Sequence, residues 1–289
     1  MQSSSIQIFK LGLIGFPLGH SLSPKIHAAA LESCQLKGSY SLFPIPPEDK
    51  QGLENLLNQV RAGNIHGLNV TIPHKQNVIE FLDELTPTAK SIGAVNTIYL
   101  SNDQLIGDNT DAPGFLADVK STFNFSSFRL PLSALILGAG GSARAVVYAL
   151  LNDGWTLCMA ARRPEQAKQL ATSFMSHALQ ITNYDLSKIG LSNISLIVNT
   201  TPVGMTPNLD QSPWPENIPF PLQAVVYDLV YNPPETKLFK DARAQGLNAA
   251  TGLGMLIEQA ALSFEIWTGH HPSREMLRAS LEQSIIANY

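Results

Sequence analysis

The chain has 289 residues, a length that corresponds to about two domains at roughly 150 residues each. Lys and Arg together number 19 against 23 Asp and Glu, so the net charge is −4, which argues against a nucleic-acid partner. Hydrophobic residues make up 44% and charged residues 15%, a composition that supplies a large core and excludes an intrinsically disordered chain.

Membrane and secretory signals are missing from the sequence pattern. The longest apolar runs, such as Ala145–Leu151, fall far short of the roughly 18 residues of a membrane span. The segment Met1–Ser5 has no basic region that leads into an apolar stretch, so we expect no signal peptide. Cys34 and Cys158 do not make a disulfide framework for a chain of this size. We therefore expect a soluble cytoplasmic enzyme with no membrane partner.

The first part of the chain alternates predicted strands and helices. The helix predictions rest on apolar residues at helical spacing, and the helix that begins at Pro24 has proline at its start. In chain order the elements are a strand at Ile8–Ile14, a helix from Pro24, a strand at Ser39–Ile45, a helix at Leu53–Ala62, a strand at Gly67–Ile72, a helix at Asn77–Phe81 and a strand at Ala94–Leu100. This alternation predicts an α/β fold with a mainly parallel sheet.

A second alternation begins near Ser133. We predict strands at Ser133–Leu137, Trp155–Ala160, Leu196–Asn199 and Ala224–Leu229, and helices at Ala143–Leu151, Pro164–Phe174 and Met255–Trp267. The proline-rich segment Pro202–Pro221 is predicted to be a long loop that can line a site. The two runs of strands and helices predict two α/β domains, with the last helices returning to the first domain.

A glycine-rich turn follows the strand Ser133–Leu137 and opens the next helix. It consists of Gly138, Ala139, Gly140, Gly141, Ser142 and Ala143, which fits the pattern G-x-G-x-x-G/A. Its first glycine makes the turn, and its second lets the backbone approach a pyrophosphate at the helix N-terminus. The alternative is a tight strand-to-helix turn that binds no ligand.

The end of the following strand indicates which dinucleotide is bound. An NAD site places Asp or Glu about 20 residues on, to bind the ribose 2′-hydroxyl. This chain instead has Ala160 and Ala161 followed by Arg162 and Arg163, and two guanidinium groups suit a 2′-phosphate. We therefore predict NADP rather than NAD; the alternative is a pair of solvated surface arginines.

Four segments combine hydroxyl and amide side chains with one lysine and one aspartate. They are His20–Pro24, Gly67–Lys75, Gly93–Thr97 and Gly107–Asp111. Together these side chains suit a small polyhydroxylated acid, although each segment alone is also typical of a turn.

The chain resembles the shikimate dehydrogenase family from about Leu11 to Gly269. The motifs that carry the resemblance are Gly12–Gly15 leading into His20–Pro24, Asn69–Thr71 with Lys75, Gly93–Thr97, Asn109–Asp111, Gly138–Ala143, Tyr227–Tyr231, and Gly252–Met255 with Gln259. The resemblance implies a substrate-binding and catalytic domain at residues 1–111 plus 252–289. It also implies a Rossmann-type NADP-binding domain at residues 112–251 and an active-site cleft between the domains.

The family's reaction is the reversible, NADPH-dependent reduction of 3-dehydroshikimate to shikimate, on the route to chorismate and the aromatic amino acids. The resemblance assigns catalysis to Lys75 and Asp111 and carboxylate binding to Ser21 and Ser23. The other implied substrate contacts, which include the catalytic pair, are Asn69, Thr71, Lys75, Asn96, Asp111, Tyr231 and Gln259. Leu229 and Gly252 match positions near the nicotinamide. A ketone that accepts hydride needs its oxygen stabilised and protonated, which suits a lysine oriented by a carboxylate.

Three positions depart from the family's usual pattern. Ala112 and Pro113 follow Asp111, where the family usually has Gly. Ala161 stands where the cofactor fingerprint usually has Asn, and we expect Arg163 to compensate. Thr251 precedes Gly252, where many relatives carry Asn, Asp or Gly.

Three other functions remain open at this stage. One is a quinate/shikimate dehydrogenase that accepts NAD, against which the arginine pair argues. Another is a catalytically silent relative that binds the metabolite, against which Lys75 and Asp111 argue. A methylene-tetrahydrofolate dehydrogenase shares only the two-domain plan. Both a monomer and a homodimer are compatible with the sequence.

The histidines do not predict a metal site. His20 and His27 are seven residues apart and His270 and His271 are adjacent, so neither pair has the i, i+4 spacing of a helical metal site. We expect His20 to lie behind the serine loop and to support it structurally. We expect no bound metal.

Overall fold

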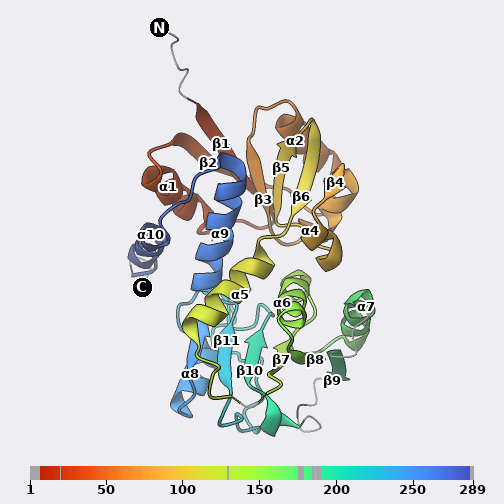
Figure 1. Ribbon diagram of the computed structural model, residues 1–289, viewed down its shortest axis with the longest axis vertical. Helices are drawn as coiled ribbons and strands as arrows, with labels where there is room; N and C mark the ends of the chain where they lie inside the picture. The colour runs from red at the N-terminus through yellow and green to blue at the C-terminus, as the bar shows by residue number, and fades with distance from the viewer. Residues whose placement is uncertain are drawn as a thin grey trace. The chain divides into compact units, whose positions relative to one another are not determined.

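The computed structural model in Figure 1 describes residues 7–19, 21–128, 130–174, 179–183, 186 and 190–286. The chain divides into two compact units, Met1–Thr110 with Ile257–Tyr289, and Asp111–Leu256. Within the described ranges each unit holds a six-stranded sheet; Figure 1 draws the first from red to yellow and the second from green to blue. The α/β fold class is therefore confirmed. The sequence predicts domain boundaries after residues 111 and 251, whereas the two compact units divide after residues 110 and 256. Which unit binds which ligand stays a prediction.

The sheet of the first unit is mixed. Its strands are β1 (Ile8–Gly15), β2 (Lys37–Pro44), β3 (Gly67–Val70), β4 (Glu84–Leu85), β5 (Thr97–Ser101) and β6 (Gln104–Asp108), in the order β2-β1-β3-β5-β6-β4. β1 pairs in parallel with β2 and β3, whereas β5 runs antiparallel to both of its neighbours. The β5–β6 hairpin, which the sequence pattern did not predict, turns at Asn102 and Asp103 with φ of 49° and 61°. Two consecutive residues with positive φ suit the right-handed twist of a hairpin.

Helices cover this sheet and supply its core. They are α1 (Ser23–Ser33), α2 (Lys50–Arg61), α3 (His74–Asn77), the 3₁₀ helix η1 (Val78–Phe81), α4 (Pro87–Ile92), α9 (Leu253–Thr268) and α10 (Arg274–Ile286). α2 buries the predicted stripe Leu53, Leu56, Leu57 and Val60 in one cluster with Leu68 of β3. The N-cap Asp49 accepts a hydrogen bond from Gly52 N–H at 2.8 Å, which explains why α2 begins here, earlier than predicted.

The second unit contains a fully parallel sheet of the doubly wound type. Its strands are β7 (Ser133–Leu137), β8 (Thr156–Ala161), β9 (Leu179–Asn183), β10 (Leu196–Asn199), β11 (Val225–Asp228) and β12 (Ala249–Thr251). Its helices are α5 (Asp111–Thr122), α6 (Gly141–Asn152), α7 (Pro164–Phe174), η3 (Leu191–Asn193) and α8 (Lys237–Ala244). The strand order β12-β11-β10-β7-β8-β9 reverses direction between β7 and β10, which is where dinucleotides bind in such sheets.

The predicted elements of the second unit are confirmed to within two residues at their ends, and residues 202–221 form a loop as predicted. α5, β9, η3, β12, α8 and α10 were not predicted, because they are short or carry weak apolar patterns. In the described ranges, no helix combines the length and the apolar character needed to cross a membrane.

Candidate active site

Two serine side chains lie at the start of α1. Ser21 Oγ accepts a hydrogen bond from Ser23 N–H at 3.2 Å, and both side chains are half-buried. Pro24 occupies the first turn, where its missing N–H leaves no helical bond unmade. Hydroxyl groups at the positive end of an eleven-residue helix favour a bound carboxylate, which supports the predicted role of the serines. His20, predicted to support this loop, lies outside the described residues.

The carboxamides of Asn96 and Gln259 meet in the first unit although 163 residues separate them in the chain. Asn96 Nδ2 donates to Gln259 Oε1 at 3.3 Å, while Asn96 Oδ1 accepts from Thr110 N–H at 2.8 Å and from Thr97 Oγ1 at 2.9 Å. Asn96 is buried, so these bonds hold its side chain in one orientation. Two of the predicted substrate contacts therefore form one polar surface.

Sequence reasoning missed a buried residue that supports this pair. Ser263, on α9, contacts Thr97 Oγ1 at 2.8 Å and Thr110 Oγ1 at 3.0 Å. Its position four residues after Gln259 places both side chains on one face of the helix, which is the signal that could have found it.

Lys75 lies on α3, in the segment that follows β3. Its carbonyl accepts a hydrogen bond from Val95 N–H at 2.7 Å, which ties α3 to the Gly93–Thr97 motif. Thr71, half-buried at the end of β3, donates its N–H to Ile14 O at 2.8 Å. Backbone bonds thus hold both predicted site residues close to the end of the sheet.

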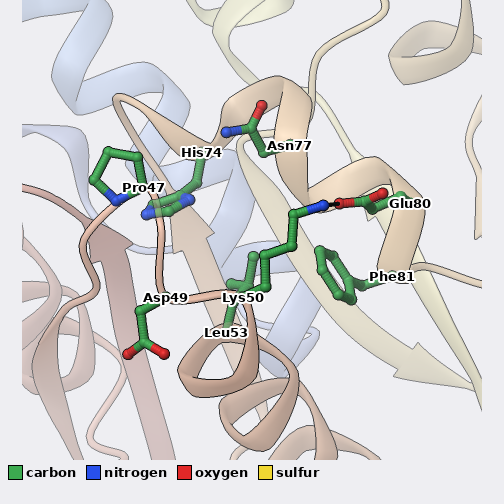
Figure 2. A pocket seen from close by; sticks show the side chains of 8 residues that line it. All are labelled: Pro47, Asp49, Lys50, Leu53, His74, Asn77, Glu80 and Phe81. Atoms are coloured by element: carbon green, nitrogen blue, oxygen red, sulfur yellow. Dashed lines mark hydrogen bonds and ion pairs between the residues drawn. The ribbon is translucent and has the colours of Figure 1, made fainter.

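His74 anchors the segment that carries Lys75. It is 1% exposed, and its Nε2–H donates to Ile45 O at 2.6 Å. Figure 2 shows its ring in the wall of a cavity that Lys50 and Glu80 border through a 2.8 Å ion pair. None of the predicted substrate or cofactor residues lines this cavity, so we assign His74 a structural role.

Asp111 opens α5 and is buried in the second unit. A carboxylate in the first turn of a helix is stabilised by the helix dipole. The departure at Ala112 and Pro113 is accommodated there: Pro113 falls within the first turn, where no backbone N–H is required. The catalytic roles of Lys75 and Asp111 stay predictions.

The glycine turn between β7 and α6 has the geometry that a dinucleotide site needs. Gly138 has φ of +111°, and a Cβ there would lie 2.7 Å from Thr200 Oγ1. Gly140 is the N-cap of α6, and a Cβ there would meet nothing within 4 Å. Gly138 is therefore required by the fold, whereas Gly140 keeps the space beside the helix N-terminus open. The residues present fit a pyrophosphate at this turn.

Arg162 and Arg163 follow β8 directly and are both exposed. Ala161 is 4% exposed and brings no polar group to this end of the strand. The assignment of 2′-phosphate recognition to the two guanidinium groups stays a prediction.

The loop after β11 carries two predicted contacts, Leu229 and Tyr231. Leu229 N–H donates to Asn199 O at 3.0 Å, and a Cβ on Gly252 would lie 2.2 Å from Leu229 O. The structure therefore brings Leu229 and Gly252 together, and only glycine permits this approach. Burial raises the pKa of the Tyr231 hydroxyl, which keeps it protonated as a hydrogen-bond donor.

Asp228 holds this loop in place and was not predicted as a site residue. Its carboxylate accepts from Asn199 Nδ2 at 2.8 Å, Val230 N–H at 3.0 Å and Thr236 Oγ1 at 2.6 Å. Burial nevertheless raises its pKa to about 6, because desolvation outweighs the three donors. A polar residue that ends an apolar strand was the signal available in the sequence.

We expect Asp228 to give the stability of the protein a specific pH dependence. Between about pH 4 and pH 6 the native carboxyl binds more protons than the unfolded one, so its contribution to the free energy of unfolding decreases as pH rises. At about 1.4 kcal/mol per pKa unit, wild type should lose on the order of 3 kcal/mol relative to Asp228→Asn between pH 4 and pH 7.

Urea unfolding of both proteins across this pH range measures the difference. Asp103→Asn, a substitution in the exposed β5–β6 turn, is the control and should follow wild type at every pH. A difference between wild type and Asp228→Asn that stays constant with pH would contradict the assignment.

Within the described ranges, no group of three or more His, Cys, Asp or Glu side chains could hold a metal ion. The expectation that the protein uses no metal stays a prediction.

Comparison with known proteins decides the family. The description "Shikimate dehydrogenase substrate binding domain" matches residues 13–98, and "Shikimate 5′-dehydrogenase C-terminal domain" matches residues 252–282. The shikimate dehydrogenase (NADP(+)) of Salinibacter ruber is 41% identical over 263 residues, which cover 89% of this chain and 90% of that protein. The chain belongs to the shikimate dehydrogenase family. The resemblance stated from the motifs is confirmed.

Solved structures of the family agree with this fold. The shikimate 5-dehydrogenase of Thermus thermophilus, in complex with NADP(H) and shikimate, is 37% identical with a TM-score of 0.84 and covers 95% of this chain and 99% of its own. The quinate dehydrogenase of Corynebacterium glutamicum, in complex with NAD, is 29% identical with a TM-score of 0.85 and covers 96% and 100%. The fold is thus shared by enzymes named for different substrates and solved with different cofactors.

Proposed function

We propose that this protein catalyses the reversible reduction of 3-dehydroshikimate to shikimate with NADPH, a step towards chorismate and the aromatic amino acids. The observation that carries the proposal is the contact between the Asn96 and Gln259 carboxamides, which joins two distant family motifs into one surface suited to a polyol. The serines at the start of α1 add a site for the substrate carboxylate.

Different residues of the chain carry out different parts of the proposed reaction. Bound NADPH supplies the hydride. Lys75 stabilises the negative charge that develops on the ketone oxygen and donates a proton to it, and Asp111 is the second member of the catalytic pair that the family motifs imply. Asn96, Gln259 and Thr71 orient the hydroxyl groups of the ring, which holds the carbonyl in a reactive geometry.

Absorbance at 340 nm tests the proposal directly. Purified protein is assayed with shikimate or quinate, each with NADP or NAD. NADPH formation from shikimate well above the other three rates supports the proposal. Comparable rates with quinate or NAD would instead assign the protein to the broader class that the similarity to quinate dehydrogenase represents. A folded protein that binds NADP but forms no reduced cofactor with either substrate would be a silent binding relative.

The arginine pair should determine the preference for NADP. We expect Arg162→Ala with Arg163→Ala to raise KM for NADP by about 10- to 100-fold and to leave KM for NAD within about twofold, because the exposed pair should together contribute about as much as one charge-assisted contact, worth about 1.5–3 kcal/mol. Arg243→Ala, an exposed residue of α8, is the matched control. If the double variant raises both KM values equally, the arginines do not read the 2′-phosphate.

Location and assembly belong to the same proposal. Cys34 and Cys158 are both free, which agrees with a reducing, cytoplasmic compartment. A monomer and a homodimer both remain compatible with the proposed activity.

A further inference from the structure

Asn69 on β3 was predicted to contact substrate, yet its carboxamide is fully occupied by the protein. Asn69 Oδ1 accepts from Tyr40 Oη at 2.8 Å and from His27 Nε2 at 3.1 Å. Asn69 Nδ2 donates to Asn96 O at 3.1 Å and to Ser263 Oγ at 3.0 Å. A carboxamide has two acceptor sites and two donor hydrogens, so these four bonds use its full capacity. A direct substrate contact would require one of them to break.

His27 and Tyr40 hold the oxygen end of this carboxamide. A carbonyl oxygen only accepts, so His27 must carry its proton on Nε2. The His27 and Tyr40 rings stack with centroids 4.3 Å apart and an interplanar angle of 3°, and His27 is 0% exposed. Burial lowers the pKa of His27 to about 3, so the ring is a neutral donor at physiological pH. A reversed carboxamide would place its oxygen against the Asn96 carbonyl oxygen, which only accepts hydrogen bonds.

The bonds on the nitrogen side of Asn69 lead to the proposed substrate contacts. Ser263 Oγ lies 2.8 Å from Thr97 Oγ1 and donates to Gln259 O at 2.9 Å. Thr97 in turn donates to Asn96 Oδ1 at 2.9 Å. Asn69 therefore touches the backbone of Asn96 directly. Through Ser263 it reaches the backbone carbonyl of Gln259 and Thr97, and Thr97 bonds the Asn96 carboxamide, which in turn bonds the Gln259 carboxamide.

We propose that Asn69 is a positioning residue that holds the Asn96 and Gln259 carboxamides in one orientation for the substrate, with its nitrogen end directed by the Asn96 carbonyl and its oxygen end held by His27 and Tyr40. This role rests on the proposed function, because it acts on the groups that would bind shikimate. It replaces the direct contact that the family resemblance implied for Asn69.

A double-mutant cycle between Asn69 and Ser263 tests the proposal. We expect Asn69→Ala to raise KM for shikimate about tenfold and Ser263→Ala about threefold, with kcat and KM for NADP within about twofold. If Asn69 acts through Ser263, the double variant should be about tenfold impaired, close to the worse single variant. The matched control is Asn58→Ala on the exposed face of α2, which should behave as wild type.

A double variant impaired about thirtyfold would show independent effects and would overturn the proposal, as would an unchanged KM for shikimate in Asn69→Ala. If Asn69→Ala does not fold, Asn69→Ser takes its place in the same cycle: an unchanged KM for shikimate overturns the proposal, and a rise that Ser263→Ala does not increase further, with unchanged KM for NADP, supports it. Wild type is assayed first. Without shikimate activity in wild type both proposals fail, whereas an active wild type with additive variants rejects only the positioning role.

Discussion

Replacement of Lys75 by alanine is expected to lower kcat about a thousandfold while KM for shikimate changes less than about threefold. The lysine is proposed to act on charge that develops only in the transition state, and removal of such a group lowers kcat by about 10²–10⁴ with little effect on ground-state binding. Because Val95 N–H binds the Lys75 carbonyl rather than its side chain, the alanine variant should keep the position of α3.

Steady-state kinetics with shikimate and NADP measure this split, and circular dichroism checks the fold. Lys90→Ala, an exposed lysine of α4, is the matched control and should retain wild-type kinetics. Near-normal turnover in Lys75→Ala would remove the lysine from the mechanism. A large rise in KM with unchanged kcat would instead give it a purely binding role.

Alanine substitutions at Gly138 and Gly140 should impair different properties: Gly138→Ala the stability of the fold, and Gly140→Ala the binding of NADP. Gly138→Ala places a side chain at φ of +111° and 2.7 Å from Thr200 Oγ1, so we expect a loss of stability of about 2–4 kcal/mol. Gly140→Ala meets nothing within 4 Å and should leave the melting temperature within about 2 °C of wild type. Its methyl group occupies space that we assign to the pyrophosphate, so KM for NADP should rise about 10- to 100-fold.

Thermal unfolding and cofactor kinetics of the two variants separate these effects. Gly63→Ala has positive φ but no neighbouring atoms within 4 Å, so it isolates the cost of backbone strain from that of the Thr200 contact. A Gly140→Ala protein with wild-type KM for NADP would show that the cofactor does not approach this turn. Equal stability of Gly138→Ala and wild type would contradict the steric argument.

The β7–α6 region of the second unit was predictable because its signals are local, whereas α5, β9, β12 and α8 of the same unit were missed. This region consists of the apolar strand Ser133–Leu137, the glycine turn and α6, which follow one another in the chain. Each of them can be recognised from its own residue pattern without reference to distant residues. The first unit was harder to predict. The β5–β6 hairpin carries no Asn-Gly or Asp-Gly pair at its turn, and β4 has only two residues, too few to show a period.

The residues of the candidate site also differ in whether the sequence alone could identify them. Residues such as Ser21, Lys75 and Asp111 could be named from motifs, because each motif is a short run of the chain. The support given by Asp228 could not, although Asp228 lies within the motif Tyr227–Tyr231, since an aspartate at the end of a strand is as typical of a turn as of a buried anchor. Only its three donors, one of them eight residues away at Thr236, distinguish the two.

Sequence alone determined the family, the two α/β units and the glycine turn between β7 and α6, and it named most of the residues proposed to meet substrate and NADP. These follow from residue types at fixed local spacing, which is what dictates strand, turn and helix. Only the tertiary structure decided how side chains distant in the chain share hydrogen bonds: Asn96 with Gln259, and Asn69 with His27, Tyr40 and Ser263. A carboxamide can bind substrate or protein with the same four hydrogen-bonding positions, and which it does depends on the partners that folding brings to it.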